Sequence, residues 1–166
     1  MSPAYMTALG TSSSAATIPV TVECTKRNGV PDAIADFVIP LGATIHLAGS
    51  TLKITTFAVA IMIVTGMELN VPAPLGFVFM LGIVMIAAPG VPGGAIMAAA
   101  GVLSSILGFD EAAVGLMIAA YIAIDSFGTA TNVTGDGAIA AVMTRLSKGR
   151  VEGDLTAGRH EQVHGV

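Results

Sequence analysis

The stretch LGFVFMLGIVMIAAPGVPGGAIMAAAGVLSSIL, residues 75–107, decides the fold of this chain. Its middle, PGVPGG at 89–94, cannot continue a helix, because proline lacks a backbone donor and glycine is costly inside a helix. The flanking arms of about 14 and 13 residues would each reach roughly 20 Å as helices. Neither arm crosses a hydrocarbon layer about 30 Å thick. We therefore predict a re-entrant helical hairpin over 75–107, called the second hairpin below.

The composition places this hairpin in a membrane. Of the 166 residues, 54% are hydrophobic and only 11% are charged, and the mean hydropathy is +0.82. Soluble domains average about 25% charged residues, so this chain lacks the polar coat that water requires. The fold class predicted is an all-α membrane protein that lies in the lipid bilayer. The single cysteine, Cys24, excludes a disulfide framework within the chain.

The charged residues orient the chain across the bilayer. Basic residues gather at Lys26 and Arg27 and again from Arg145 onward, and the positive-inside rule places both groups in the cytoplasm. The polar breaks at 66–74 and 108–111 then lie outside. We expect a multi-pass protein of the cell (plasma) membrane.

Three further segments complete the predicted organisation. Residues 33–67 form a transmembrane helix broken at mid-membrane, and 112–144 form the final transmembrane helix. Residues 1–28 form a first hairpin with a small polar tip at 11–17, whose leading arm is cut short. The charged, glycine-rich stretch 147–166 is predicted to be a disordered cytoplasmic tail. The alternative is a kinked bundle in which the glycines and prolines serve packing alone.

Four polar residues of the final helix carry the chemistry. Asp125, Thr129, Asn132 and Asp136 are spaced 4, 3 and 4 residues apart and share one helix face. A buried Asp at the bilayer centre costs at least about 2.5–3.5 kcal/mol, so each needs a cation, a donor or water. This face predicts a ligand and ion site. The alternative is that one Asp only pairs with Lys53.

The broken helix adds two ionisable side chains, His46 and Lys53, seven residues apart and on one face if the helix resumes regularly. His46 is interpreted as a proton carrier, a substrate ligand or a satisfied polar group at the break. Lys53 lies in mid-span, which favours a buried partner such as an Asp.

Enzyme and nucleic-acid functions are disfavoured. Membrane aspartyl proteases need Gly-x-Gly-Asp, and 133–136 reads Val-Thr-Gly-Asp, without the first glycine. The serines at 12–14 have no base beside them in the sequence. No phosphate-binding loop, cysteine/histidine metal spacing or basic-aromatic surface is present in the sequence, so we predict no enzyme, no cofactor and no nucleic-acid partner.

Four ordered stretches resemble a known family. They are the serine-rich tip with TIPVT at 17–21, PLGATI at 40–45, GVPG at 90–93 and NVTGD at 132–136. Residues 5–145 thereby resemble the C-terminal half of the dicarboxylate/amino acid:cation symporters, the glutamate transporter family. The resemblance implies secondary transport (symport) of an amino acid by a partial transport domain over 1–146. It further implies a parent with upstream scaffold helices that assembles as a homotrimer.

The resemblance also implies roles for individual residues. The substrate would be bound by two serines of the first tip, the tip of the second hairpin and three residues of the final helix: Ser13, Ser14, Val91, Pro92, Gly93, Asp125, Thr129 and Asn132. The coupling ion would be bound by Gly42, Thr44, His46, Asn132 and Asp136, with sodium held at Asp136 and Asn132.

Departures from the family pattern change which coupling ion and which substrate we expect. The Asn-Met-Asp-Gly-Thr signature of the family reads HLAGS at 46–50, so two sodium-binding residues, an Asn and an Asp, are replaced. The Ser and Thr that precede the second tip in the family align with Met85 and Ala88, which removes further sodium ligands. Coupling is therefore expected to use fewer sodium ions, or protons through His46, with Lys53 standing in for a lost cation. The arginine that clamps an acidic side chain aligns with Gly128, which favours a neutral amino acid. The alternative is a truncated or degenerate membrane subunit that does not transport.

Overall fold

Every element in the described part of this computed structural model, residues 1–68 and 72–147, is an α-helix or a connection between helices. The all-α prediction is therefore confirmed. The predicted disordered tail falls, after Ser147, outside the described residues. The helices in chain order are α1 (Ser2–Thr11), α2 (Ser14–Arg27), α3 (Asp32–Ile45), α4 (Ala48–Val64), α5 (Pro72–Met85), α6 (Gly94–Leu107), α7 (Glu111–Ala123) and α8 (Asp125–Leu146).

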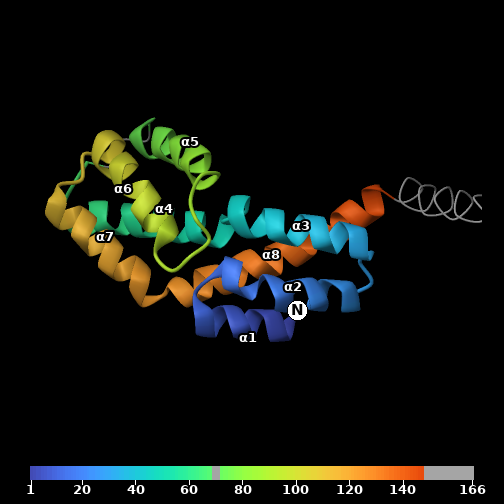
Figure 1. The fold of residues 1–166 in the computed structure, drawn as a ribbon. Helices are drawn as coiled ribbons and strands as arrows, with labels where there is room; N and C mark the ends of the chain where they lie inside the picture. Colours follow the sequence, from blue (N-terminus) through green and yellow to red (C-terminus); the bar gives the residue numbers. More distant parts are fainter. Residues whose placement is uncertain (69–71, 148–166) are drawn as a thin grey trace, which may run out of the picture.

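The helices gather into two halves, with α1, α2, α3 and α8 in one and α4, α5, α6 and α7 in the other (Figure 1). We call them the α8 half and the α4 half. Contact between α4 and α8 joins them. In the α4 half, large apolar side chains such as Phe77, Leu81 and Met117 form one continuous core. In the α8 half the apolar clusters are smaller and built around alanines such as Ala8, Ala35 and Ala140.

Hydroxyl side chains take up much of the interior of the α8 half. Thr17, Thr21 and Thr25 of α2 are all buried. Thr17 and Thr21 each donate to the backbone carbonyl four residues earlier, at 2.7 and 3.0 Å. A helix that satisfies its own hydroxyl groups can bury them without leaving a polar atom unpaired. The weakly apolar second arm of the first hairpin is therefore compatible with a buried position.

The broken transmembrane segment has its interruption where the sequence predicts it. Helix α3 ends at Ile45 and α4 begins at Ala48, so His46 and Leu47 form the break. Counted through that break, Asp32–Val64 is 33 residues long and apolar enough to cross a membrane. Among the described residues it is the one helix that meets this test unaided.

The final segment differs from the expectation of a single helix over 112–144. Helices α7 and α8 meet at Ile124 with a bend of 63°. Lys53 explains how a break is tolerated where the sequence has neither glycine nor proline. Its ammonium lies 3.4 Å from the carbonyl oxygens of Tyr121 and Ile124 at the bend, which also accept from the backbone N–H groups of Ile124 and Phe127 at 3.3 Å. The polar face of α8 consequently starts at a helix N-terminus instead of in mid-helix.

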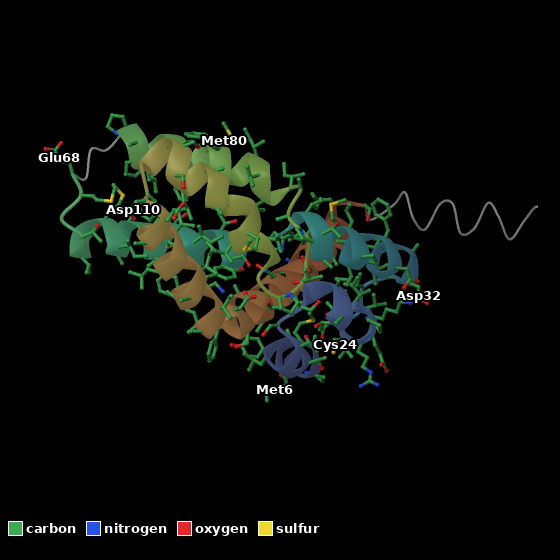
Figure 2. All side chains as sticks on the ribbon, turned by 60° about the vertical axis from the view of Figure 1, so that its left-hand side comes forward. Met6, Cys24, Asp32, Glu68, Met80 and Asp110 are labelled. Carbon is green, nitrogen blue, oxygen red and sulfur yellow. The ribbon has the colours of Figure 1, made fainter. Side chains whose placement is uncertain are left out.

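The two ends of the molecule carry the polar connections. Glu68 and Asp110 lie at one end, and Asp32 lies at the other (Figure 2). At the latter end Lys26 contacts Asp36 at 2.8 Å and Asp32 at 3.8 Å, which ties α2 to α3. The predicted outside breaks and the predicted cytoplasmic pair therefore fall at opposite ends of the helices.

Candidate substrate and ion site

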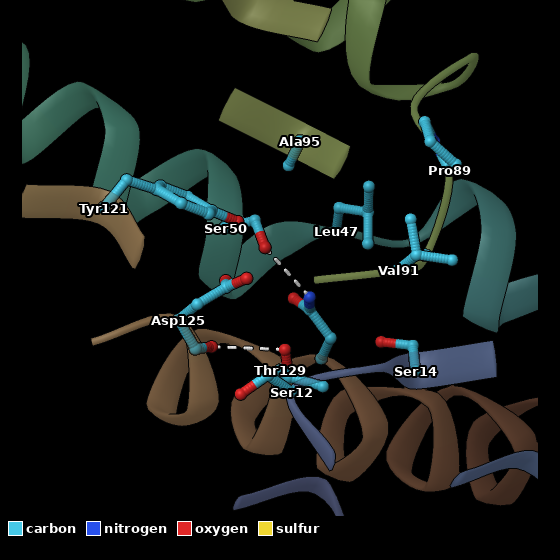
Figure 3. A pocket seen from close by; sticks show the side chains of 12 residues that line it. Ser12, Ser14, Leu47, Ser50, Pro89, Val91, Ala95, Tyr121, Asp125 and Thr129 are labelled. Carbon is cyan, nitrogen blue, oxygen red and sulfur yellow. Dashed lines mark hydrogen bonds between the residues drawn. The ribbon is translucent and has the colours of Figure 1, made fainter. Parts of the chain in front are cut away.

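A small cavity lies where the two halves meet. It offers about 10 Å³ to the centre of a water-sized sphere, room for about one water. Its walls come from both hairpin tips, from the start of α4 and from the junction of α7 with α8. The lining residues are Ser12, Ser14, Leu47, Ser50, Pro89, Gly90, Val91, Ala95, Tyr121, Asp125, Thr129 and Asn132 (Figure 3).

Asp125, the first residue of α8, is the acid of this cavity and is 5% exposed. Its Oδ1 accepts from the Lys53 ammonium at 2.9 Å, and its Oδ2 accepts from the backbone N–H of Gly93 at 2.9 Å. The Lys53 ammonium also lies 3.4 Å from the centre of the Tyr121 ring. A buried charge needs such partners, because desolvation of an unpaired one is very costly. The pairing of Lys53 with an Asp, left open by the sequence, is therefore formed with Asp125.

The two hairpin tips contact each other beside this carboxylate. The Ser13 hydroxyl donates to the Gly90 carbonyl oxygen at 3.0 Å, and the Ala15 N–H donates to the same oxygen at 3.1 Å. Ser13 also caps α2, since its hydroxyl oxygen accepts from the Ala16 N–H at 3.2 Å. A Cβ at Gly90 would collide with the carbonyl oxygen of Ala43, so a glycine is required at this close approach. Contact between the tips separates the cavity from the surface on that side.

Two hydroxyl groups of the predicted set border the cavity in different ways. Thr129 donates to the Asp125 carbonyl at 3.1 Å and is thereby occupied within α8. Ser14 is 3% exposed, and its hydroxyl has no hydrogen-bond partner among the described residues. Figure 3 shows that hydroxyl directed toward the middle of the cavity. Ser14 is thus a free donor of the site.

Asn132 fixes the start of α4 against α8. Its Oδ1 accepts from the Gly49 N–H at 2.8 Å, and its Nδ2 donates to the Ser50 hydroxyl at 3.1 Å. The helices are so close here that a Cβ at Gly49 would lie 2.6 Å from the carbonyl oxygen of Gly128. One Nδ2 hydrogen remains for a ligand, because an amide carries two.

Asp136, about three turns beyond Asp125 on α8, forms the core of the predicted ion site. Its Oδ1 lies 2.8 Å from Nδ1 of His46, while its Oδ2 is buried and has no partner among the described residues. A Cβ at Gly42 would lie only 2.5 Å from Oδ1, so α3 and α8 touch at this point. An unpaired buried carboxylate oxygen is expensive and fits an oxygen-seeking cation such as sodium.

Two residues of the predicted set are not brought to these sites. Thr44 is exposed, and its hydroxyl donates to the Leu41 carbonyl at 2.8 Å. Pro92 is exposed and does not line the cavity, although Val91 lines it and Gly93 contacts Asp125.

Seven lining residues were not among the predicted site residues, and three of them carry a hydroxyl group: Ser12, Ser50 and Tyr121. Ser12 belongs to the serine cluster of the first tip, and its backbone has a φ of 49°, a left-handed value that turns the chain between α1 and α2. Tyr121 precedes Asp125 by four residues, a spacing that could have signalled a shared face. Ser50 carries no comparable signal, because its inward position depends on where α4 begins.

The described residues define an all-helical protein with a cavity between two helix connections and two buried carboxylates on one helix. A model of the sodium:dicarboxylate symporter family matches residues 1–146. The chain belongs to the sodium:dicarboxylate symporter family, which confirms the resemblance seen in the sequence.

Curated relatives agree with the family assignment. The chain is 36% identical to excitatory amino acid transporter 1 of Homo sapiens over 146 residues, which are 87% of this chain and 27% of that protein. It is 36% identical to excitatory amino acid transporter 3 of Mus musculus over 153 residues, 92% of this chain and 29% of that protein. Excitatory amino acid transporter 4 of Mus musculus is 35% identical over 153 residues. The chain thus spans less than a third of the length of these relatives.

Proposed function

We propose that this chain supplies the substrate cavity and a coupling-ion site of a secondary symporter for an amino acid or a related small carboxylate. The observation that carries the proposal is a buried acid, Asp125, in a cavity lined by both hairpin tips. Irregular backbone within a membrane must be buried in protein or line a cavity, and residues of both tips line this one. Family membership and relatives named as amino acid transporters support the same function. The protein would act as a multi-pass protein of the plasma membrane.

The second hairpin, α5 to α6, is proposed as the re-entrant gate of the cavity. Its tip bonds to the first tip through Gly90 and to Asp125 through Gly93. Opening the cavity therefore requires the loss of a few hydrogen bonds at one tip and no unfolding of a helix.

The coupling ion is proposed to be sodium at Asp136, with the free Oδ2 as ligand. Asn132 is proposed to assist through its position one turn earlier on α8. His46, bonded to the other carboxylate oxygen, is the alternative carrier of the coupling charge.

The side-chain class of the substrate remains a proposal. Gly128 leaves no guanidinium group in the cavity, which is the reason for expecting a neutral amino acid. However, the relatives are named for excitatory amino acids, and Lys53 provides a cation: a Cβ at Gly128 would lie 3.1 Å from its Nζ. Neutral and acidic substrates must therefore be tested side by side.

Uptake into proteoliposomes tests the function. The protein is reconstituted in its native assembly, and uptake of alanine, aspartate, propionate and succinate is followed under an imposed sodium or pH gradient. Uptake of at least one of them, driven by a sodium gradient and reduced in Asp125→Asn, is expected. His46→Asn should alter the ion dependence only if the histidine carries the coupling charge. The size of the reconstituted particle decides whether the assembly is a trimer.

A second candidate is a membrane subunit that does not transport. It is motivated by the replaced ligands at 46–50 and by the small cavity. If the folded, reconstituted protein takes up none of the four solutes under either gradient, this candidate is favoured over the symporter.

A further inference from the structure

Four helices begin at the walls of the substrate cavity. The lining residues Ser14, Ser50, Ala95 and Asp125 lie in the first turns of α2, α4, α6 and α8, which are 14, 17, 14 and 22 residues long. The N-terminus of a helix carries roughly half a positive charge, and its first N–H groups have no intrahelical acceptors. The potential inside the cavity is therefore favourable for an anionic group.

The free hydroxyl of Ser14 is an independent sign of a ligand. It is buried, it is directed into the cavity and it has no partner among the described residues. The hydroxyl is open to the cavity and is not bonded within the protein, so it is available to a ligand that accepts its hydrogen bond. A carboxylate is such an acceptor and suits the surrounding helix N-termini.

The one acid of the cavity already has its cation. Lys53 places its ammonium against Asp125 at 2.9 Å, against two carbonyl oxygens and over the Tyr121 ring. An ammonium group has three donors, and these three oxygens account for all of them. The second oxygen of Asp125 accepts from Gly93. Asp125 thus offers no unpaired oxygen to the ammonium group of a ligand.

We propose that Lys53 takes the place of a ligand's ammonium group beside Asp125, so that the preferred substrate is a small carboxylate without an α-amino group. The inference rests on the proposed function and assigns the substrate class of the same cavity. It makes Lys53 a specificity-determining residue that acts by neutralising Asp125, without touching the substrate.

The surroundings of Lys53 hinder its displacement by an amine. Lys53 also lines an apolar groove of about 300 Å³, together with Leu52, Phe57 and Phe127. An ammonium group pushed away from Asp125 would enter this groove, where no charged partner lines the wall. An amine-bearing ligand must therefore bind beside a carboxylate that keeps its own cation.

The test compares two ligand pairs that differ only in the α-amino group, succinate with aspartate and propionate with alanine. Their dissociation constants are measured by calorimetry on the protein in detergent, in its native assembly. The amine-free member of each pair is expected to bind at least about tenfold more tightly. Tighter binding of aspartate or alanine overturns the inference but leaves the symporter proposal intact. If none of the four binds or is transported, the proposed function itself fails.

Two variants separate the role of Lys53 from a general effect on the cavity. Lys53→Met removes the cation and keeps the stem, so Asp125 becomes free to bind an amine and the preference should reverse. Lys53→Met/Asp125→Asn removes both charges, keeps the cavity neutral and should retain the preference for the amine-free members. If Lys53→Met does not fold, the ligand preferences of the wild type and of the double variant still test the inference. An unchanged preference in a folded Lys53→Met variant, or a reversed one in the double variant, overturns the inference.

Discussion

The surroundings of the two buried carboxylates of α8 differ in one respect that separates their roles. Asp125 has a partner on each oxygen, a lysine ammonium on one and the tip of the second hairpin on the other. Asp136 has a histidine on one oxygen and no partner on the other among the described residues. The first is a saturated pair that links the tip of the second hairpin to the helix junction, and the second has one oxygen left for the ion proposed above.

The difference follows from the cation on the broken helix. A lysine reaches Asp125 with a fixed charge and three donors, whereas a histidine presents one nitrogen to Asp136. The fixed charge suits a structural and selective role, because it cannot leave without stranding both partners. The open oxygen suits an ion that enters and leaves during transport. The predictions below test whether this division of roles is correct.

Removal of the saturated pair is expected to have the largest effect. Lys53→Met leaves Asp125 charged and buried without its cation, which should lower the free energy of unfolding by about 3–5 kcal/mol. Lys53→Met/Asp125→Asn should recover most of that loss, since no buried charge remains. Thermal unfolding in detergent measures both variants. If the single variant is no less stable than the double one, Lys53 and Asp125 are not an energetically coupled pair.

A smaller effect is expected from crowding the incomplete site. Gly42→Ala places a methyl group 2.5 Å from Oδ1 of Asp136, so the carboxylate must shift. Overpacking of this kind costs about 1–3 kcal/mol, and the ion site should be distorted with it. Stabilisation by sodium, measured as the rise in the unfolding temperature between sodium-free and sodium-containing buffer, should disappear.

Gly101→Ala in α6 is the matched control for this measurement. A Cβ there has no neighbour within 4 Å, so the variant gains about 1 kcal/mol at most, from helix propensity alone. Its response to sodium should equal that of the wild type. Retention of the sodium response in Gly42→Ala would show that sodium binds elsewhere than at Asp136.

The sequence predicted the breaks of the fold better than the contacts made there. Proline and glycine at 89–94 and the polar run at 46–50 interrupt helices by their own local chemistry, and both interruptions are present. The bend at Ile124 has no local signal, because it depends on Lys53 reaching over from α4. The spacing of Asp125 and Asp136 placed them on one face, but which one pairs with Lys53 depends on the arrangement of helices across the two halves.

The smallest expected effect concerns the contact between the hairpin tips. Ser13→Ala removes the hydroxyl that caps α2 and donates to the Gly90 carbonyl. The loss of a cap costs about 1 kcal/mol, which is less than either change above. Ser13→Thr keeps a hydroxyl group and is the matched control.

Because the tip would be held by fewer bonds, the second hairpin should open more often in Ser13→Ala. Hydrogen exchange of residues 86–93, followed by mass spectrometry, should accelerate in Ser13→Ala and remain near the wild-type rate in Ser13→Thr. Equal exchange in the two variants would mean that the Ser13 bond does not hold the second hairpin closed, which leaves that function to the Ala15 bond at Gly90 and the Asp125 bond at Gly93.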